Sequence, residues 1–422
     1  MDQVLKLFLG EAIETPRPGQ VLTDIEAMKL ALAEAWKGVG RVSPNPPVGC
    51  VILSSKNEFL AQGHHSRPGG PHAEIAALAH LAGVPELERQ RDGWDLSPLD
   101  SRGGGEKLQG ARMFVTLEPC AHAGKTPSCA RTLASLPIAE VVFGMIDPFP
   151  AVSGRGRDIL ERAGKRCTLF AEHSSDAQML VQELNELCEQ FLVNVRFSRP
   201  FITLKVACSL DGVFTLRTGE SQWITGEQSR AFAQFFRGSH DAILVGRATV
   251  GKDNPSLTIR HPQFANVQKK IVVVDTHGVL LEREDLKLFK LHRAENLIWA
   301  VGEKWDGRPR VPVEIVRVPA DARGLSLRVL HDCLWQRGIR SLFIEAGGKT
   351  LSAHLAAEVA DRLLMFQSPL ILGSRSGRVW SEGFGVQRLS EALRLKGLRR
   401  MSLGNDLVVT GRIAYAEDVE ID

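Results

Sequence analysis

Four residues in two parts of the chain have types and spacing that could perform metal chemistry. His72 and Glu74 follow Pro71, and Cys120 and Cys129 come later in the chain. One imidazole and two thiolates are ligands that zinc prefers, and a catalytic zinc keeps its fourth position for water. Such a zinc lowers the pKa of its bound water to roughly 7, and a nearby carboxylate could carry the proton to a substrate. We therefore predict a catalytic zinc site with Glu74 as the proton carrier.

The order of these residues narrows the chemistry. His-x-Glu followed by Pro-Cys is typical of zinc deaminases, in which the glutamate moves protons and does not bind the metal. Residues two apart in the middle of a helix point in different directions, so His72 and Glu74 are expected in a first helical turn after Pro71. Taken singly, a histidine or cysteine near a helix start more often packs structurally. The joint pattern favours the metal site, although Cys120 and Cys129 are nine positions apart instead of in Cys-x-x-Cys.

The composition sets limits on the class of protein. A chain of 422 residues with 44% hydrophobic and 24% charged residues predicts two or three folded domains. A net charge of +3 and an aromatic content of 6% give no basic, base-stacking surface, so nucleic acid is not expected as a partner. Seven cysteines are too few for a disulfide framework, and no secretory signal or apolar run of roughly 18 residues is present. We expect a cytoplasmic protein with reduced thiols and no membrane partner.

The pattern along the chain predicts alternating helices and strands. After a loosely packed extension at 1–22, a helix is expected from Thr23, and strands at 48–53, 113–117 and 141–146. These elements predict an α/β domain at 23–173, with a mobile surface insertion at 85–110. A connecting helix and linker at 174–199 lead to a second α/β domain at 200–422. The strands predicted there are 201–207, 242–245, 271–274, 297–301, 342–344 and 407–409.

Segments of both halves resemble one known family, the bifunctional riboflavin biosynthesis deaminase/reductases. The deaminase half is similar at 45–52, 70–74 and 116–129, and the reductase half at 204–212, 219–225, 248–250, 253–260 and 344–348. The resemblance covers residues 23 to 415 apart from the insertion. One loop departs from the family, which usually has asparagine at the position of Phe149 after Asp147-Pro148. Any contact made by that amide is absent here.

The resemblance implies a cytidine-deaminase-like three-layer domain followed by a dihydrofolate-reductase-like α/β domain. It implies one zinc ion in the first domain and NADPH in the second. The expected reactions are hydrolytic deamination of 2,5-diamino-6-(ribosylamino)-4(3H)-pyrimidinone 5'-phosphate and reduction of the product's ribosyl side chain to ribityl. The expected partners are this small phosphorylated pyrimidine and, as in the family, further copies of the same chain.

The resemblance also assigns roles to individual residues. In the first domain His72, Cys120 and Cys129 would bind zinc, Glu74 would be catalytic, and Asn45 and His65 would contact the pyrimidine. In the second, the expected NADPH contacts are Ala207, Trp223, Thr249, Asp253, Gly347 and Gly348. The expected substrate contacts are Ser221, Arg237, Leu257, Arg260 and Glu345, with the two arginines suited to a phosphate. Lys205 would act as a charged group near the carbon that accepts hydride.

Plainer interpretations compete with three of these roles. His65 could be an ordinary surface histidine beside His64. Arg237 could be a solvated arginine on a surface helix, which would be the preferred interpretation without the family resemblance. Lys205 could simply pack its aliphatic stem at a strand edge.

Two other functions share some of these features. An RNA-editing deaminase would use the same His-x-Glu motif, but it predicts a basic, aromatic-lined channel that the composition does not indicate. A non-catalytic regulator could keep an enzyme scaffold without its activity. Replacing Glu74 with glutamine separates an enzyme from such a regulator, because only an enzyme would lose deamination while keeping its zinc.

Overall fold

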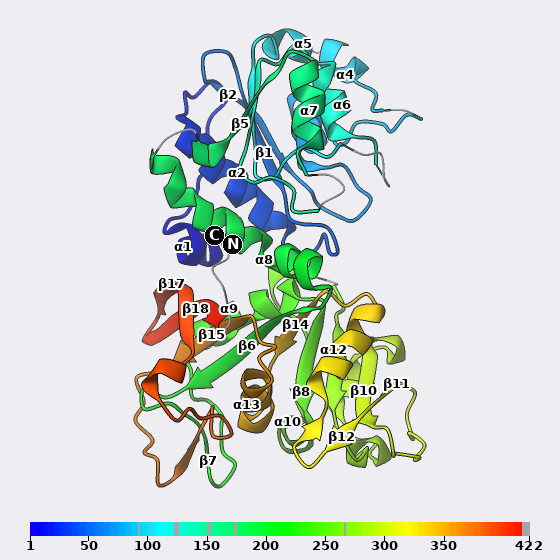
Figure 1. Ribbon diagram of the computed structural model, residues 1–422, viewed down its shortest axis with the longest axis vertical. Coiled ribbons are helices and arrows are strands. Elements are labelled where there is room, and N and C mark those ends of the chain that lie inside the picture. The colour runs from blue at the N-terminus through cyan, green and yellow to red at the C-terminus, as the bar shows by residue number, and fades with distance from the viewer. Residues whose placement is uncertain are drawn as a thin grey trace. The chain divides into compact units, whose positions relative to one another are not determined.

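The computed structural model describes residues 1–91, 93–101, 103–121, 126–149, 153–172, 175–265 and 267–415. The chain divides into two compact units, Met1–Arg196 and Phe197–Asp422, and each is considered by itself. Both units are α/β structures with a central sheet (Figure 1). Within the described residues, no helix is both long and apolar enough to cross a membrane.

Unit 1 contains a five-stranded sheet in the order β2-β1-β3-β4-β5. β1 is antiparallel to β2 and β3, whereas β3, β4 and β5 are parallel. The strands are β1 (Gly49–Leu53), β2 (Phe59–His64), β3 (Arg112–Val115), β4 (Glu140–Phe143) and β5 (Arg166–Leu169). The α-helices are α1 (Asp2–Leu9), α2 (Asp24–Gly38), α3 (Ala73–Leu81), α4 (Ser97–Ser101), α5 (Gly104–Lys107), α6 (Cys129–Ala134), α7 (Arg155–Arg162) and α8 (Val181–Phe197). Two 3-10 helices, Phe170–Glu172 and Ser175–Leu180, precede α8.

Helices cover both faces of this sheet, so every residue of β1 is buried. Cys50 and Ile52 belong to a core cluster with side chains of α3, α6 and α7. On the other face α2 lies very close to β1, since a Cβ on Gly49 would be 2.0 Å from the carbonyl oxygen of Ala31. The predicted helix from Thr23 is confirmed, and it begins with a capping box in which Thr23 and Glu26 bond each other's main-chain amides.

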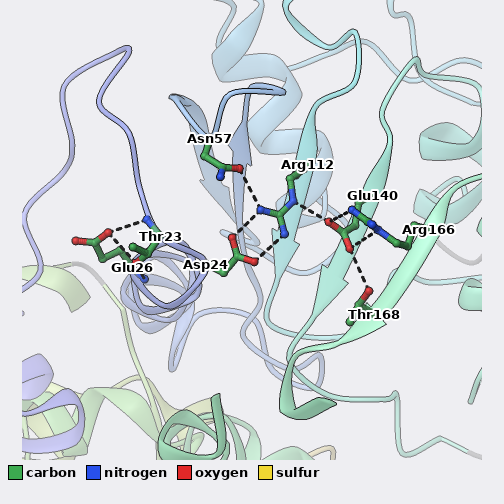
Figure 2. Close-up of polar contacts among 8 residues, drawn as sticks. All are labelled: Thr23, Asp24, Glu26, Asn57, Arg112, Glu140, Arg166 and Thr168. Carbon is green, nitrogen blue, oxygen red and sulfur yellow. Dashed lines mark hydrogen bonds and ion pairs between the residues drawn. The ribbon is translucent and has the colours of Figure 1, made fainter. Parts of the chain in front are cut away.

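A polar network ties the start of α2 to the sheet (Figure 2). Arg112 on β3 bonds both carboxylate oxygens of Asp24 at 2.6 and 2.7 Å, and its Nε bonds Glu140 on β4 at 2.7 Å. Arg166 on β5 makes a second ion pair with Glu140 at 2.8 Å. The buried carboxylate is therefore shared by two guanidiniums, as expected for a charge removed from water.

Two expectations about unit 1 were wrong. Residues at the N-terminus are not loosely packed, because α1 buries one apolar face and Phe8 stacks on Trp36 of α2 with ring centroids 4.5 Å apart. The segment 85–110 is not only a surface insertion, because it contains α4 and α5 and contributes Leu99, Leu108 and two further side chains to the core. The helices in both segments are short, and such helices are stabilised mainly by packing on the surfaces that they cover. Their apolar residues alone therefore do not predict them.

Unit 2 contains a nine-stranded sheet in the order β11-β10-β9-β8-β14-β6-β15-β18-β17. The strands from β11 to β15 are parallel, and β18 and β17 add an antiparallel edge. These strands are β6 (Phe201–Cys208), β8 (Ala242–Gly246), β9 (Lys270–Val274), β10 (Leu297–Gly302), β11 (Glu314–Val318), β14 (Ser341–Ile344), β15 (Arg362–Gln367), β17 (Arg394–Leu403) and β18 (Asp406–Ala414). All six strands predicted for this half are confirmed. Four short strands form two separate pairs: β7 (Val213–Leu216) with β16 (Gly377–Val379), and β12 (Ala320–Asp321) with β13 (Gly324–Leu325).

Helices cover the two faces of this sheet as well. α12 and α13 pack on one face, while α10 and α11 pack on the other. The α-helices are α9 (Glu227–Ser239), α10 (Arg247–Asp253), α11 (Lys287–Leu291), α12 (Leu327–Gln336) and α13 (Gly348–Ala356). The 3-10 helices are Pro262–Phe264, Val279–Glu282, Ala294–Asn296 and Leu389–Glu391. Because parallel strands end at one edge, the loops after β6, β8, β9, β10 and β14 meet there, which is where open α/β sheets bind ligands.

Candidate active sites

The structure of unit 1 brings the three predicted zinc ligands together. His72 Nδ1 lies 3.5 Å from Cys120 Sγ and 3.4 Å from Cys129 Sγ. A tetrahedral zinc with ordinary bond lengths would hold such nitrogen and sulfur atoms about 3.6 Å apart. Among the described residues, this is the only group of three or more histidine, cysteine or acidic side chains placed closely enough to hold a metal. The donor set and its spacing therefore fit zinc.

Local structure explains this convergence. His72 is the extended residue before α3, which leaves its ring free of the helix, and Cys129 is the first residue of α6. The amide of Cys129 donates to Cys120 Sγ at 3.3 Å, and Ser128 Oγ donates to the carbonyl of Cys120 at 2.8 Å. Hydrogen bonds from Cys129 and His72 lower the pKa of the Cys120 thiol. The surroundings thus favour a thiolate, the form that binds metal, at Cys120, whereas the hydrogen bond to Cys120 and burial raise the pKa of Cys129.

Glu74 and Thr126 complete the surroundings of His72. Glu74 is only 3% exposed in the first turn of α3, as predicted, and burial raises the pKa of its carboxyl group. Thr126 Oγ1 lies 3.2 Å from His72 Nε2, on the side of the ring away from the cysteines. Sequence reasoning missed Thr126, and its only signal was its place between the two cysteine ligands. Residues 122–125 of that segment lie outside the described residues.

The two predicted pyrimidine contacts lie beside this cluster. Asn45 Nδ2 and His65 Nε2 are 3.1 Å apart, and the His65 ring makes an edge contact with His72 at 5.2 Å between centroids. His65 is 2% exposed, so the surface interpretation was wrong. Its Nδ1 lies 2.9 Å from the carbonyl oxygen of Pro71, which requires hydrogen on Nδ1 and leaves Nε2 to accept from Asn45. Burial lowers the pKa of His65, which favours the neutral ring.

The divergent loop after β4 is partly described. Phe149 is exposed, and its amide donates to Asp147 Oδ1 at 2.9 Å. Residues 150–152 lie outside the described residues. In the part of the loop that the structure describes, the phenyl ring replaces the family's amide without entering the core.

Unit 2 has a cavity of about 1570 Å³ where the parallel strands end. Every residue predicted for the reductase site lines it: Lys205, Ala207, Ser221, Trp223, Arg237, Thr249, Asp253, Leu257, Arg260, Glu345, Gly347 and Gly348. The cavity also extends along the ends of β9 and β10, where Thr276 and Gly302 line it. Sequence reasoning missed this part, because the order of the strands in the sheet is needed to place those loops beside the others.

The end of β14 suits a dinucleotide phosphate. Gly347 caps α13, and a Cβ on it would meet nothing within 4 Å, so its backbone is open to a ligand. A Cβ on Gly348 would lie 3.0 Å from the carbonyl oxygen of Trp380, so a side chain there would be crowded. Amides at the start of α13 supply the positive potential that binds phosphate. The cavity and this helix start fit NADPH.

Three charged residues of the cavity form a local system. Arg237 donates from Nε and Nη2 to Glu345 Oε2 at 2.9 and 2.6 Å, and from Nη1 to the carbonyl of Thr258 at 2.9 Å. Its side chain is 14% exposed, so the solvated interpretation was wrong. Lys205 is partly buried, and burial lowers the pKa of its ammonium group while Glu345 opposes that shift. Within the described residues the ammonium group of Lys205 has no hydrogen-bonded partner, which leaves it available to a ligand.

Comparisons with known proteins agree with both sites. The family model described as the RibD C-terminal domain matches residues 200–409, and the cytidine and deoxycytidylate deaminase zinc-binding region matches residues 22–145. The riboflavin biosynthesis protein RibD of Aquifex aeolicus is 32% identical over 92% of this chain and 97% of its own. The chain belongs to the RibD family. The RibD of Escherichia coli K12 is 33% identical over 90% of this chain and 96% of its own.

Solved structures of this family have the same fold. RibD of Acinetobacter baumannii superposes with a TM-score of 0.72 at 28% identity, covering 92% of this chain and 98% of that one. The deaminase/reductase of Thermotoga maritima gives a TM-score of 0.73 at 32% identity with the same coverage. The predicted fold class is therefore confirmed: a cytidine-deaminase-like domain and a dihydrofolate-reductase-like domain. Zinc and NADPH are the cofactors of the two family domains, as predicted.

Proposed function

We propose that this protein catalyses two consecutive steps of riboflavin biosynthesis. Unit 1 deaminates 2,5-diamino-6-(ribosylamino)-4(3H)-pyrimidinone 5'-phosphate, and unit 2 reduces the product to 5-amino-6-(ribitylamino)uracil 5'-phosphate. The observation that carries the proposal is the presence in one chain of a His-Cys-Cys cluster beside a buried glutamate and a cavity lined by all twelve predicted reductase residues. Membership of the RibD family supports the same pair of activities.

In unit 1, each residue has a separate task. His72, Cys120 and Cys129 would hold the zinc ion, which would supply a Lewis acid able to activate water at neutral pH. Glu74 is buried and has a raised pKa, so it is suited to hold the proton that the departing amino group needs. The paired side chains of Asn45 and His65 present polar atoms that could orient the pyrimidine ring.

In unit 2, the cavity residues orient two ligands. The cavity would hold NADPH, which would supply the hydride for reduction at the ribosyl carbon. We assign its contacts to Ala207, Trp223, Thr249, Asp253, Gly347 and Gly348. Substrate contacts are assigned to Ser221, Arg237, Leu257, Arg260 and Glu345. Arg237 keeps one hydrogen on each terminal nitrogen after its three bonds, so it can still donate to a phosphate. We assign Lys205 as the charged group near the ribosyl carbon that accepts hydride, where its ammonium group would donate to the sugar oxygen that gains charge.

A coupled assay tests the proposal. Purified protein is analysed for zinc and then incubated with the diaminopyrimidinone phosphate and NADPH, with ammonia release and NADPH oxidation followed together. We expect one zinc per chain and NADPH oxidation that depends on prior deamination. Protein without zinc, or ammonia release without NADPH oxidation, would refute the bifunctional assignment. Deamination of transfer RNA instead would support the RNA-editing alternative.

Three further features are proposed on the same basis. The deaminase domain spans 23–173 and the reductase domain spans 200–422, with 174–199 as their connection. The division of the structure at Arg196 falls inside that connection. The family resemblance also suggests a cytoplasmic homo-oligomer, and the molar mass in solution would test the assembly.

A further inference from the structure

Glu118 lies two residues before the zinc ligand Cys120 and is 4% exposed. Its carboxylate accepts four main-chain hydrogen bonds from the segment that follows β4. Oε1 accepts from the amides of Gly156 at 2.9 Å and Arg157 at 3.1 Å. Oε2 accepts from the amides of Gly154 at 3.0 Å and Asp147 at 3.3 Å. One side chain therefore bonds main-chain groups on both sides of the loop between β4 and α7.

The chemistry of this contact is specific for a carboxylate. Its two oxygens offer about four acceptor positions and no hydrogen, which matches four converging N–H groups. Negative charge at the start of α7 is also favoured by the helix dipole. A glutamine at this position would have the same shape, but its NH₂ group would face two N–H donors. The two amides facing that NH₂ group would then lose their acceptor in a part-buried place.

A second contact ties the same segment to the metal-binding turn. A Cβ on Gly156 would lie 2.0 Å from the carbonyl oxygen of Pro119 and 3.1 Å from Glu118 Oε1. The first turn of α7 thus packs directly on the residue before Cys120. This close contact joins the position of α7 to that of the turn that carries Cys120.

We propose that Glu118 is a positioning residue for the zinc site. Its carboxylate joins the β4–α7 segment to the Glu118-Pro119-Cys120 turn, and so holds Cys120 Sγ at the distance from His72 that a metal requires. This inference rests on the proposed deaminase function, because it assumes that zinc binds there. It adds a residue that neither binds metal nor contacts substrate.

Three variants of the full-length chain test this role. Glu118→Gln removes acceptors from the amide cluster, and Gly156→Ala pushes on Pro119 from the other side. Glu161→Gln is the matched control, because Glu161 lies on α7 and its carboxylate pairs with the exposed Arg157 side chain at 2.7 Å, outside the amide cluster. Zinc affinity is measured by competition with a chromophoric chelator. Cobalt(II) spectra report the thiolate geometry, and NADPH oxidation with the deaminated substrate reports the integrity of unit 2.

We expect Glu118→Gln to weaken zinc affinity by about 10- to 100-fold, the range found when groups that orient metal ligands are changed. Its cobalt thiolate bands should shift, while its rate of NADPH oxidation stays unchanged. The Glu161→Gln protein should keep the zinc affinity and cobalt spectrum of the unaltered chain. Gly156→Ala should weaken zinc binding in the same direction. The proposal is overturned if either test variant, folded by circular dichroism, binds zinc and cobalt like the unaltered chain. Failure of the unaltered chain to bind zinc would instead overturn the proposed function.

Discussion

The contact between Thr126 and His72 gives the sharpest prediction for the metal site. If Nδ1 of His72 presents its lone pair to the metal, Nε2 must carry the hydrogen and donate it to Thr126 Oγ1, 3.2 Å away. Thr126→Val keeps the shape of the side chain but replaces the acceptor with a methyl group. Because Thr126 is buried, the N–H group is then left without a partner whenever metal is bound.

The size of the effect follows from this loss. An unpartnered buried donor costs about 1–3 kcal/mol, which corresponds to a fall in zinc affinity of about 5- to 150-fold. Chelator competition measures that affinity directly. Thr126→Ser keeps the hydroxyl group and should retain most of the zinc affinity. Thr132→Val is the matched control, because Thr132 is equally buried nearby but its hydroxyl donates to the carbonyl of Ser128.

Either of two results would refute the reasoning. Unchanged zinc affinity in Thr126→Val would mean that the hydroxyl group does not orient His72. An equal loss in Thr132→Val would mean that the affinity reports general packing around α6. The serine variant separates a lost hydrogen bond from a lost methyl contact.

Three further predictions concern catalysis and stability. Glu74→Gln should lower deaminase kcat by at least about 100-fold while zinc content and NADPH oxidation with the deaminated substrate persist, as metal analysis and the two assays would show. Lys205→Met should lower reductase kcat and leave NADPH affinity, measured by fluorescence titration, within about twofold; a large loss of affinity would contradict a role toward substrate. Arg112→Met should destabilise unit 1 by about 3 kcal/mol at pH 7, because Glu140 then keeps only the exposed Arg166 and the hydroxyl group of Thr168 as partners; urea unfolding followed in this unit measures it. Burial raises the pKa of Glu140, but hydrogen bonds from its arginines outweigh this and lower it, so its stabilising contribution is present above the unfolded pKa of about 4.3 and is lost as pH falls below it. The difference between Arg112→Met and the unaltered chain should therefore shrink in acid, and a constant difference would contradict the role of this ion pair.

The sequence was most informative where chemistry depends on residue type and spacing. His72, Cys120 and Cys129 could be grouped because their types and order, with a glutamate two positions after the histidine, match the zinc deaminase signature. Five of the six strands predicted for unit 2 are parallel, and they were found because buried parallel strands are runs of branched apolar residues. Both signals depend on the types and order of residues, so they can be recognised without knowledge of the tertiary structure.

Other features depend on contacts between distant segments and could not be predicted. The ion pair of Arg237 joins it to Glu345, 108 positions away, and turns an apparently solvated arginine into a fixed one. Glu118 shows no sign in sequence that its carboxylate meets four amides. Residues of α1 form too short an apolar pattern to identify without the surface of α2. In each case the role of the residue depends on a partner from a distant segment, which the residue type alone does not indicate.

The place of β6 in its sheet has a consequence for how the chain is made. β6 is the first strand of unit 2 to leave the ribosome, yet it lies between β14 and β15, which begin only at Ser341 and Arg362. Both edges of an apolar strand therefore wait without their final partners while most of the unit is synthesised. Unpaired edges of this kind invite pairing with other chains. Translation that stalls before β14 should thus release aggregation-prone fragments even when unit 1 has already folded.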